Sequence, residues 1–326
     1  MADHDILEKC RDAWNRRDSP EPASDYALLE KVGGGFLARG RDGSATLVFQ
    51  IADTDGGRVG RRSGGTELLA HRVTRFHFEG ETWEGSAAAL RCTNPELVDT
   101  FAVLASDVVG RLSTQPSWPD IAALVDQWQT LLVPRGRPSR KRELGLWGEL
   151  WFVNAARDPE ALLAAWRGPE GDASDFFLGG VAVEVKTSRL LRRHHVSQSQ
   201  VPTPVGDYSA WLLSLWTKQD PRSGVTVATL VDNLVGRARD PAEVLKTLAR
   251  AGYSATDRGE YDSRYLLLEE PEWYPLETVP RVKSADAGVS HLRYQVVLDE
   301  SRKGQSAVAH RQWNHFHGWA YGSREE

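Results

Sequence analysis

The chain has 326 residues, of which 40% are hydrophobic and 26% charged, and a formal net charge of −5 at pH 7. These values are ordinary for a soluble globular protein, and the negative charge argues against a chain that coats nucleic acid by charge alone. No apolar run approaches the roughly 18 residues of a membrane span, the N-terminal residues are polar, and the two cysteines, Cys10 and Cys92, lie far apart. We therefore expect a cytoplasmic protein with neither a membrane partner nor a disulfide framework.

Residues 1–134 are expected to form a β-rich N-terminal domain. Apolar residues recur at helical spacing in residues 1–18, which predicts a short helix there. From about residue 26 to residue 90 the pattern changes to short apolar runs between glycine-rich turns, which is typical of antiparallel strands. Residues 95–112 and 119–132 have the pattern of two amphipathic helices, and the proline- and glycine-rich segment 134–139 is the expected linker.

The rest of the chain is expected to form a core domain over 135–235 and a C-terminal α/β extension over 236–326 that packs on it. The core begins with a predicted helix over 142–157 and a hairpin, and apolar runs at 210–216 and 225–231 then predict two buried strands. In the extension, 241–251 is a predicted helix with Asp240 as its N-cap and Gly252 as its stop signal. Two further strands are predicted at 265–269 and 291–298.

The stretch from residue 135 to residue 200 is locally basic. It has eleven Lys and Arg residues against eight Asp and Glu, a balance of +3 that leaves −8 for the rest of the chain. Basic clusters flank the predicted hairpin on both sides. They are either ordinary solvated loops or phosphate contacts, and their position around a carboxylate site favours the second interpretation. The candidate phosphate-binding residues are Arg140, Lys141, Arg142, Arg189, Arg192, Arg193 and His195.

The most informative segment is the predicted hairpin that begins at Asp175. Gly179 and Gly180 lie between two apolar runs, which is a signal for a two-residue β-turn. With those glycines as the turn, Asp175 faces Glu184 across the strand pair, with Cβ atoms roughly 4.5–5.5 Å apart. Because side chains alternate along a strand, Glu184 and Lys186 then share one face of the sheet with Asp175.

Two carboxylates that face each other in a valine-rich strand pair repel, and a divalent cation between them would remove the conflict. Mg²⁺ prefers one or two carboxylates together with water and phosphate oxygens. We therefore expect Asp175, Glu184 and the Val185 carbonyl to bind Mg²⁺, with Mn²⁺ as a substitute. Lys186 would orient or deprotonate the attacking water. The alternative is a surface hairpin that bears ordinary charges.

The predicted helix before the hairpin adds a third acid, Glu149, in an otherwise apolar stretch. Gly145 and Gly148 lie beside it, and each glycine weakens a helix by about 1 kcal/mol relative to alanine, so a close approach to another element is the expected reason for them. Glu149 is therefore a candidate metal ligand. The alternative is a partly exposed acid at the edge of the helix.

Five blocks in chain order resemble the bacterial PD-(D/E)XK motif protein family, a branch of the restriction-endonuclease-like nucleases. They are Gly145-Leu-Trp-Gly-Glu149-Leu, Ala165-Trp-Arg-Gly, Asp175-Phe, Val183-Glu-Val-Lys186-Thr and His195-Val-Ser-x-x-Gln200. The blocks cover about residues 145–200, and weaker similarity continues towards residue 294. Ser174 stands where the name of the motif has proline, a position that is tolerant across the superfamily.

The resemblance implies an α+β fold with a restriction-endonuclease-like αβββαβ core, in which a mixed four-stranded sheet is flanked by helices. It implies that Asp175 and Glu184 are the metal-binding acids, that Lys186 is the catalytic lysine and that Glu149 is the acid of the first core helix. It also implies that Gln200 contacts phosphate or a base.

The expected function is that of a Mg²⁺-dependent DNA endonuclease in a bacterial restriction-like, anti-phage defence system. The partners implied by the resemblance are double-stranded DNA and helicase, ATPase or methyltransferase subunits of such a system, and a homodimer is left open. Two alternatives remain. One is a non-catalytic adaptor that keeps the nuclease fold and binds DNA or a partner, and the other is a β-rich scaffold whose N-terminal domain carries the function.

Overall fold

The structure, a computed structural model, describes residues 2–16, 26–51, 60–79, 81–167, 174–197, 209–282 and 292–299. The chain forms two compact units, which we describe separately. Unit 1 comprises residues 1–135, 241–249 and 253–257, and unit 2 comprises residues 136–240, 250–252 and 258–326. The expected domain boundaries at 134 and 235 stay predictions. No helix among the described residues is long and apolar enough to cross a membrane.

Unit 1 is built on a six-stranded antiparallel sheet with the strand order β1-β2-β3-β6-β5-β4. The strands are β1 (Tyr26–Val32), β2 (Gly35–Gly40), β3 (Ala45–Gln50), β4 (Arg61–Ser63), β5 (Thr66–Phe78) and β6 (Glu81–Cys92). The β-rich character predicted for residues 26–90 is therefore present in the fold.

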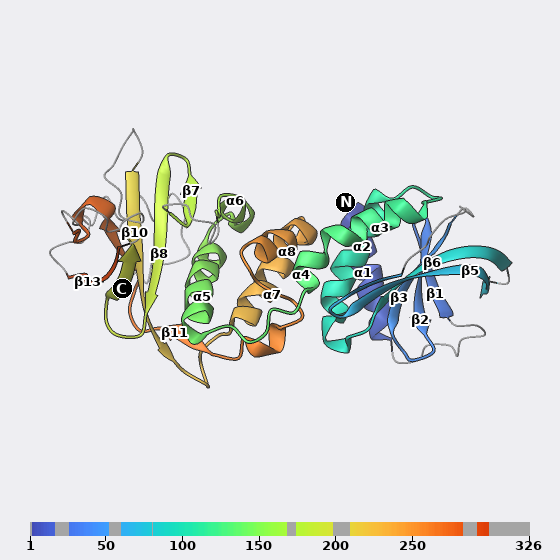
Figure 1. Cartoon of the computed structure of the whole chain (residues 1–326), viewed down its shortest axis with the longest axis horizontal. Helices are drawn as coiled ribbons and strands as arrows, with labels where there is room; N and C mark the ends of the chain where they lie inside the picture. Colours follow the sequence, from blue (N-terminus) through green and yellow to red (C-terminus); the bar gives the residue numbers. More distant parts are fainter. Residues whose placement is uncertain are drawn as a thin grey trace, which may run out of the picture. The chain divides into compact units, whose positions relative to one another are not determined.

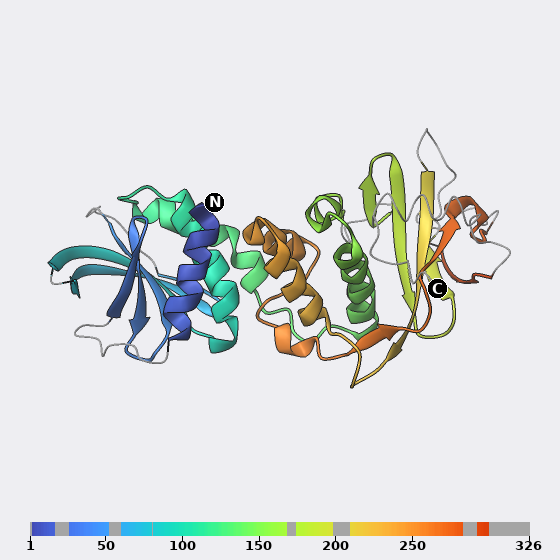
Figure 2. The same ribbon diagram turned by 180° about the vertical axis from the view of Figure 1, so that it is seen from behind.

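Unit 1 also contains helices α1 (Ala2–Asn15), α2 (Val98–Arg111), α3 (Trp118–Gln127), α4 (Gln129–Leu132) and α8 (Pro241–Arg250). Helices α1 and α2 lie side by side against the sheet (Figures 1 and 2). Trp14 joins these layers, because its ring is 5.0 Å from that of Phe101 and its Nε1 donates a hydrogen bond of 3.1 Å to the Ala38 carbonyl. Helix α8 is held by Lys246, whose Nζ lies 2.8 Å from Oδ2 of Asp107.

Unit 2 contains a five-stranded mixed sheet formed by β7 (Phe176–Leu178), β8 (Val181–Ser188), β10 (Ser209–Gln219), β11 (Tyr265–Leu267) and β12 (Glu272–Pro275). Strands β8 and β10 are parallel neighbours, and the other pairs are antiparallel. Helix α5 (Arg140–Ala155) packs on this sheet, with α6 (Pro159–Ala164) and α7 (Val227–Arg237) beside it (Figure 1).

A second, two-stranded sheet of unit 2 consists of β9 (Arg193–Ser197) and β13 (Arg293–Val297). Its apolar side chains share one buried cluster with β10, β12 and the short helix after β12, formed by Val196, Leu212, Tyr274, Leu276, Val279, Val296 and Leu298. The α+β architecture with a mixed central sheet, expected as a restriction-endonuclease-like core, is thereby confirmed.

The prediction of a strand at 225–231 is wrong, because helix α7 begins at Val227 and continues through this segment. Thr226 caps the helix, since its Oγ1 accepts a hydrogen bond of 3.0 Å from the Thr229 N–H. The buried residues of α7 are Val227, Leu230, Val231 and Leu234. They follow the i, i+3, i+4, i+7 spacing of one helix face. The abundance of β-branched residues concealed this pattern in the sequence.

Candidate active site

The hairpin of β7 and β8 has the predicted turn and register. Gly179 and Gly180 have φ values of +59° and +78°, which glycine adopts without the steric penalty of a side chain. Phe176 pairs with Val183, and Leu178 pairs with Val181. Asp175 directly precedes β7, so the next pair in this register would join it to Glu184.

Asp175 is hydrogen-bonded across the hairpin to β8, the strand that carries Glu184. Its Oδ2 accepts a hydrogen bond of 2.7 Å from the backbone N–H of Val185. On the opposite strand, Nζ of Lys186 lies 2.5 Å from Oε1 of Glu184, whose side chain is only 2% exposed. The two acids and the lysine nominated from the sequence therefore lie together in one small region of the hairpin.

Glu149 reaches the same region from helix α5. Its Oε2 accepts a hydrogen bond of 2.9 Å from Nε1 of Trp166, and the Trp166 ring stacks on Phe176 at 6.0 Å and 11°. The segment after α6 is also bound to the hairpin through its backbone, because the N–H of Arg167 donates to the Asp175 carbonyl at 2.9 Å. These contacts therefore join helix α5, the segment after α6 and the hairpin.

The four charged groups shift one another's pKa values. Burial raises the pKa of Glu149 well above its usual range, and the charges of Asp175 and Glu184 add to this. Burial also raises the pKa of Asp175, against the opposing effects of Lys186 and of the Val185 N–H. For Glu184, burial and then the charge of Asp175 raise the pKa to about 8, although Lys186 opposes the shift.

Lys186 keeps its proton in this environment. Burial alone would lower the pKa of its ammonium, but the nearby carboxylates, Glu184 first, outweigh burial and raise it. The site therefore combines a stable cation with acids that are costly to ionise. It has an affinity for further positive charge, because each such charge would allow another carboxyl to lose its proton.

Only one of the two glycines beside Glu149 makes the close approach expected from the sequence. A Cβ at Gly148 would lie 1.8 Å from Oγ1 of Thr187 on β8, so α5 and β8 can approach this closely only because Gly148 has no side chain. A Cβ at Gly145 would meet nothing within 4 Å, so the expectation is wrong for that residue.

The donor chemistry suits a hard cation, although the described residues contain no group of three His, Cys, Asp or Glu side chains placed to hold a metal ion. Glu149 interacts with the other two acids through its charge, and its role as a metal ligand stays a prediction. Mg²⁺ requires only one or two carboxylates when water and phosphate supply its other ligands. Asp175 and Glu184 meet that requirement, and both would gain from a bound cation because their pKa values are raised.

Some candidate phosphate-binding residues are exposed to solvent, and others already form ion pairs within the protein. Lys141, Arg142, Arg189, Arg193 and His195 are exposed, whereas Gln200 lies outside the described residues. Arg140 pairs with Glu143 and Asp262.

Arg192 is buried. Its Nη1 donates a 2.9 Å hydrogen bond to the Ser214 carbonyl, and its Nε lies 2.5 Å from Oε2 of Glu272. It therefore stabilises the fold, and we leave it out of the proposed phosphate contacts.

Sequence reasoning missed two polar residues next to Lys186. Ser214 pairs with Lys186 in the parallel register of β8 and β10, and its Oγ lies 2.7 Å from Nε2 of His194. Burial, followed by the charge of Lys186, lowers the pKa of His194 to about 3, so this ring is neutral. Alternation along β9 was the available signal, because His194 lies two residues from the buried Val196 and His195 points away from the core.

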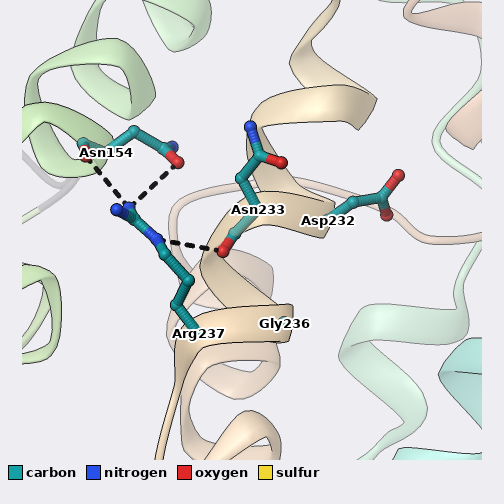
Figure 3. A pocket seen from close by; sticks show the side chains of 5 residues that line it. All are labelled: Asn154, Asp232, Asn233, Gly236 and Arg237. Carbon is teal, nitrogen blue, oxygen red and sulfur yellow. Dashed lines mark hydrogen bonds between the residues drawn. The ribbon is translucent and has the colours of Figure 1, made fainter.

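A separate polar hollow lies between α5 and α7, with a volume of about 370 Å³ (Figure 3). It is lined by Asn154, Asp232, Asn233, Gly236 and Arg237. The guanidinium of Arg237 is already bound to carbonyl oxygens, at 2.9 Å to Asn154 and 3.3 Å to Asn233. None of the four charged groups around the hairpin lines this hollow, so it is not the candidate active site.

Comparison with known proteins identifies a family. Residues 37–299 match the family described as "Putative PD-(D/E)XK family member, (DUF4420)". No curated protein and no solved structure matches the chain. The matched segment covers most of the chain and includes the hairpin, helix α5 and the two-stranded sheet of unit 2.

Proposed function

Because the chain belongs to the DUF4420 family of PD-(D/E)XK members, we propose that it is a Mg²⁺-dependent DNA endonuclease whose active site is the β7–β8 hairpin. The observation that carries the proposal is the convergence of Asp175, Glu184 and Lys186, with Glu149 in electrostatic contact with all three. Family membership supports the coarser statement, a nuclease-type phosphodiesterase. Magnesium, DNA and the individual residue roles are our extension of it.

The roles follow from charge and position. Asp175, Glu184 and the Val185 carbonyl would hold the cation, which supplies Lewis-acid stabilisation of the negative charge that develops on the phosphate. Lys186 keeps its proton at neutral pH, so its role is to orient the attacking water by hydrogen bonding and to balance phosphate charge. Glu149, held by Trp166, would ionise more readily once a cation is bound, and its negative charge would then favour that cation.

Plasmid cleavage tests the proposal directly. Purified full-length protein is incubated with supercoiled plasmid and Mg²⁺ or Mn²⁺, beside the Asp175→Asn and Lys186→Ala variants. We expect nicked or linear product with the wild type and a loss of roughly 10²–10⁴-fold in each variant, the range for a positioned catalytic group. Cleavage that persists unchanged in both variants would rule out this site.

The pairing of Glu184 with Lys186 also favours a second candidate, an adaptor in which that ion pair replaces the metal. Calorimetric titration with Mn²⁺ separates the two. An adaptor of this kind shows no binding that depends on Asp175, whereas the nuclease does. A role in phage defence and partner ATPase or methyltransferase subunits remain proposals that rest on the resemblance. A cytoplasmic location and a homodimer also remain proposals.

A further inference from the structure

The two-stranded sheet of β9 and β13 has one buried and one exposed side. Val196, Val296 and Leu298 lie in the buried cluster described above. On the other side, the register pairs Val297 with Arg193, Gln295 with His195, and Arg293 with Ser197. Directly paired residues point to the same side of a sheet. We call the exposed members of these pairs the ribbon face: Arg193, His195, Arg293, Gln295 and Val297.

The turn that leads into the ribbon face is apolar and ordered. Leu190 and Leu191 are 69% and 55% exposed, which places them among the most exposed large apolar side chains described. Leu191 adopts a φ of +50°, a conformation that is unfavourable for a branched side chain. The turn is nevertheless fixed, because Ser188 Oγ accepts a hydrogen bond of 3.1 Å from the Leu190 N–H.

The charge of this surface is positive in a chain that is negative as a whole. Arg189, Arg193 and Arg293 are exposed, and none forms an ion pair with another residue in the part of the chain that the structure describes. Asp299, the next exposed residue on this side of β13, is the nearest acid along that strand. This surface therefore combines three arginines, a glutamine and an apolar turn. Such a surface complements a nucleic acid, which offers charged phosphates and accessible base edges.

The ribbon face is also close to the candidate active site through the opposite side of β9. His194 contacts Ser214, and Ser214 is the direct neighbour of Lys186 in the sheet. The buried side of β9 is therefore linked to the proposed catalytic lysine through Ser214.

We propose that the ribbon face binds double-stranded DNA by entering the major groove. The inference rests on the proposed nuclease function. A two-stranded ribbon fits that groove, which is about 12 Å wide. Arginine can pair with a guanine edge and glutamine with an adenine edge, so Arg193, Arg293 and Gln295 would read bases or hold phosphates. The exposed Leu190 and Leu191 would contact thymine methyl groups at the same edge of the protein.

Binding of the full-length protein to a fluorescein-labelled duplex, measured by anisotropy in EDTA, tests the proposal without metal-dependent cleavage. We expect the double variant Arg193→Gln/Arg293→Gln to weaken binding about tenfold or more and to reduce the slope of log K against log salt by about 2. The matched control is Arg157→Gln/Arg222→Gln, which removes the same charge from exposed positions outside the ribbon face and should change the affinity less than about twofold. Gln295→Ala should weaken binding to some duplex sequences more than to others.

The proposal is overturned if the ribbon and control variants lose affinity equally, if neither loses any, or if the wild type does not bind the duplex. Cleavage assays distinguish a failure of the ribbon-face proposal from a failure of the proposed nuclease function. A protein that binds through the ribbon face but cleaves no DNA would refute the nuclease and leave the ribbon inference intact. If the wild type cleaves DNA and the ribbon variants cleave and bind it equally well, only the inference about the ribbon face is refuted.

Discussion

Nζ of Lys186 lies 2.5 Å from Oε1 of Glu184, and both groups are largely withdrawn from solvent. Burial and the charge of Asp175 nevertheless raise the pKa of Glu184 to about 8. A metal ion that binds this carboxyl therefore competes with a proton for it below about pH 8.

The first prediction concerns the pH dependence of metal binding. The affinity for Mn²⁺ should increase by up to about tenfold per pH unit as the pH rises towards 8, and should level off above it, because one proton is exchanged for the cation. Calorimetry in buffers with different ionisation enthalpies should detect the released proton. Glu184→Gln should bind more weakly and show a flatter pH dependence, and a wild-type affinity independent of pH would contradict the assignment.

The second prediction concerns stability without metal. The pKa of Glu184 is raised in the folded protein, so the proton favours folding, and this contribution is fully present below the unfolded value of about 4.5 and is lost as the pH rises towards 8. Glu184→Gln cannot ionise. Relative to the wild type it should gain about 1 kcal/mol or more in free energy of unfolding between pH 5 and pH 8.5. Urea denaturation at both pH values measures this difference, and a difference of zero or of opposite sign would refute it.

The third prediction separates the charge of Asp175 from its hydrogen bond. Asp175→Asn keeps an oxygen that can accept the 2.7 Å bond from the Val185 N–H, whereas Asp175→Ala leaves that donor without a partner. Both variants should lose cleavage. The alanine variant should be less stable than the asparagine variant by about 1–3 kcal/mol, the cost of an unsatisfied buried donor. Equal stability in chemical denaturation would show that the hydrogen bond contributes nothing.

The fourth prediction compares two glycines of one helix. Gly145→Ala, with open space at its Cβ, should stabilise the protein by up to about 1 kcal/mol through helix propensity. Gly148→Ala should destabilise it by about 1–3 kcal/mol, because the new methyl group would overlap Thr187. Thermal unfolding of both variants, with Gly148→Ala/Thr187→Ala as a partial rescue, tests the close contact of α5 with β8. A stabilising Gly148→Ala would disprove it.

The contrast between these glycines shows what the sequence could predict of the site. The glycine turn and strand alternation were sufficient to derive the hairpin register and to bring Asp175, Glu184 and Lys186 together, because both rules are local. The packing of α5 on β8 depends on contacts between residues far apart in the chain. The sequence alone could therefore suggest a close approach but could not say which glycine makes it.

The error in the predicted secondary structure has the same origin. Residues 225–231 are rich in β-branched residues, and the helix appears only when Thr226 is taken as a cap and Leu234 is included in the apolar pattern. Helix α8 lies in unit 1, where its Lys246 pairs with Asp107, a residue far away in the sequence. No local rule predicts such a pair.

The last prediction concerns two adjacent arginines that sequence reasoning treated alike. Arg192 is buried against Glu272 and the Ser214 carbonyl, whereas Arg193 is exposed on the ribbon face. Arg192→Ala should destabilise the protein by about 3–5 kcal/mol, because it removes the cation that pairs with the largely buried Glu272, to which Tyr274 also donates a hydrogen bond. Arg193→Ala should change the free energy of unfolding by no more than about 0.5 kcal/mol.

The effects of the two variants on DNA binding should be the reverse of their effects on stability. Arg193→Ala should weaken the complex with a duplex while the fold stays intact, since its side chain is free to contact phosphate or a base edge. Arg192→Ala, examined at a temperature where it is still folded, should bind the duplex as the wild type does, because its guanidinium is committed to the interior. If Arg192→Ala were fully stable and lost DNA binding instead, the burial of Arg192 and the assignment of the ribbon face would both have to be abandoned.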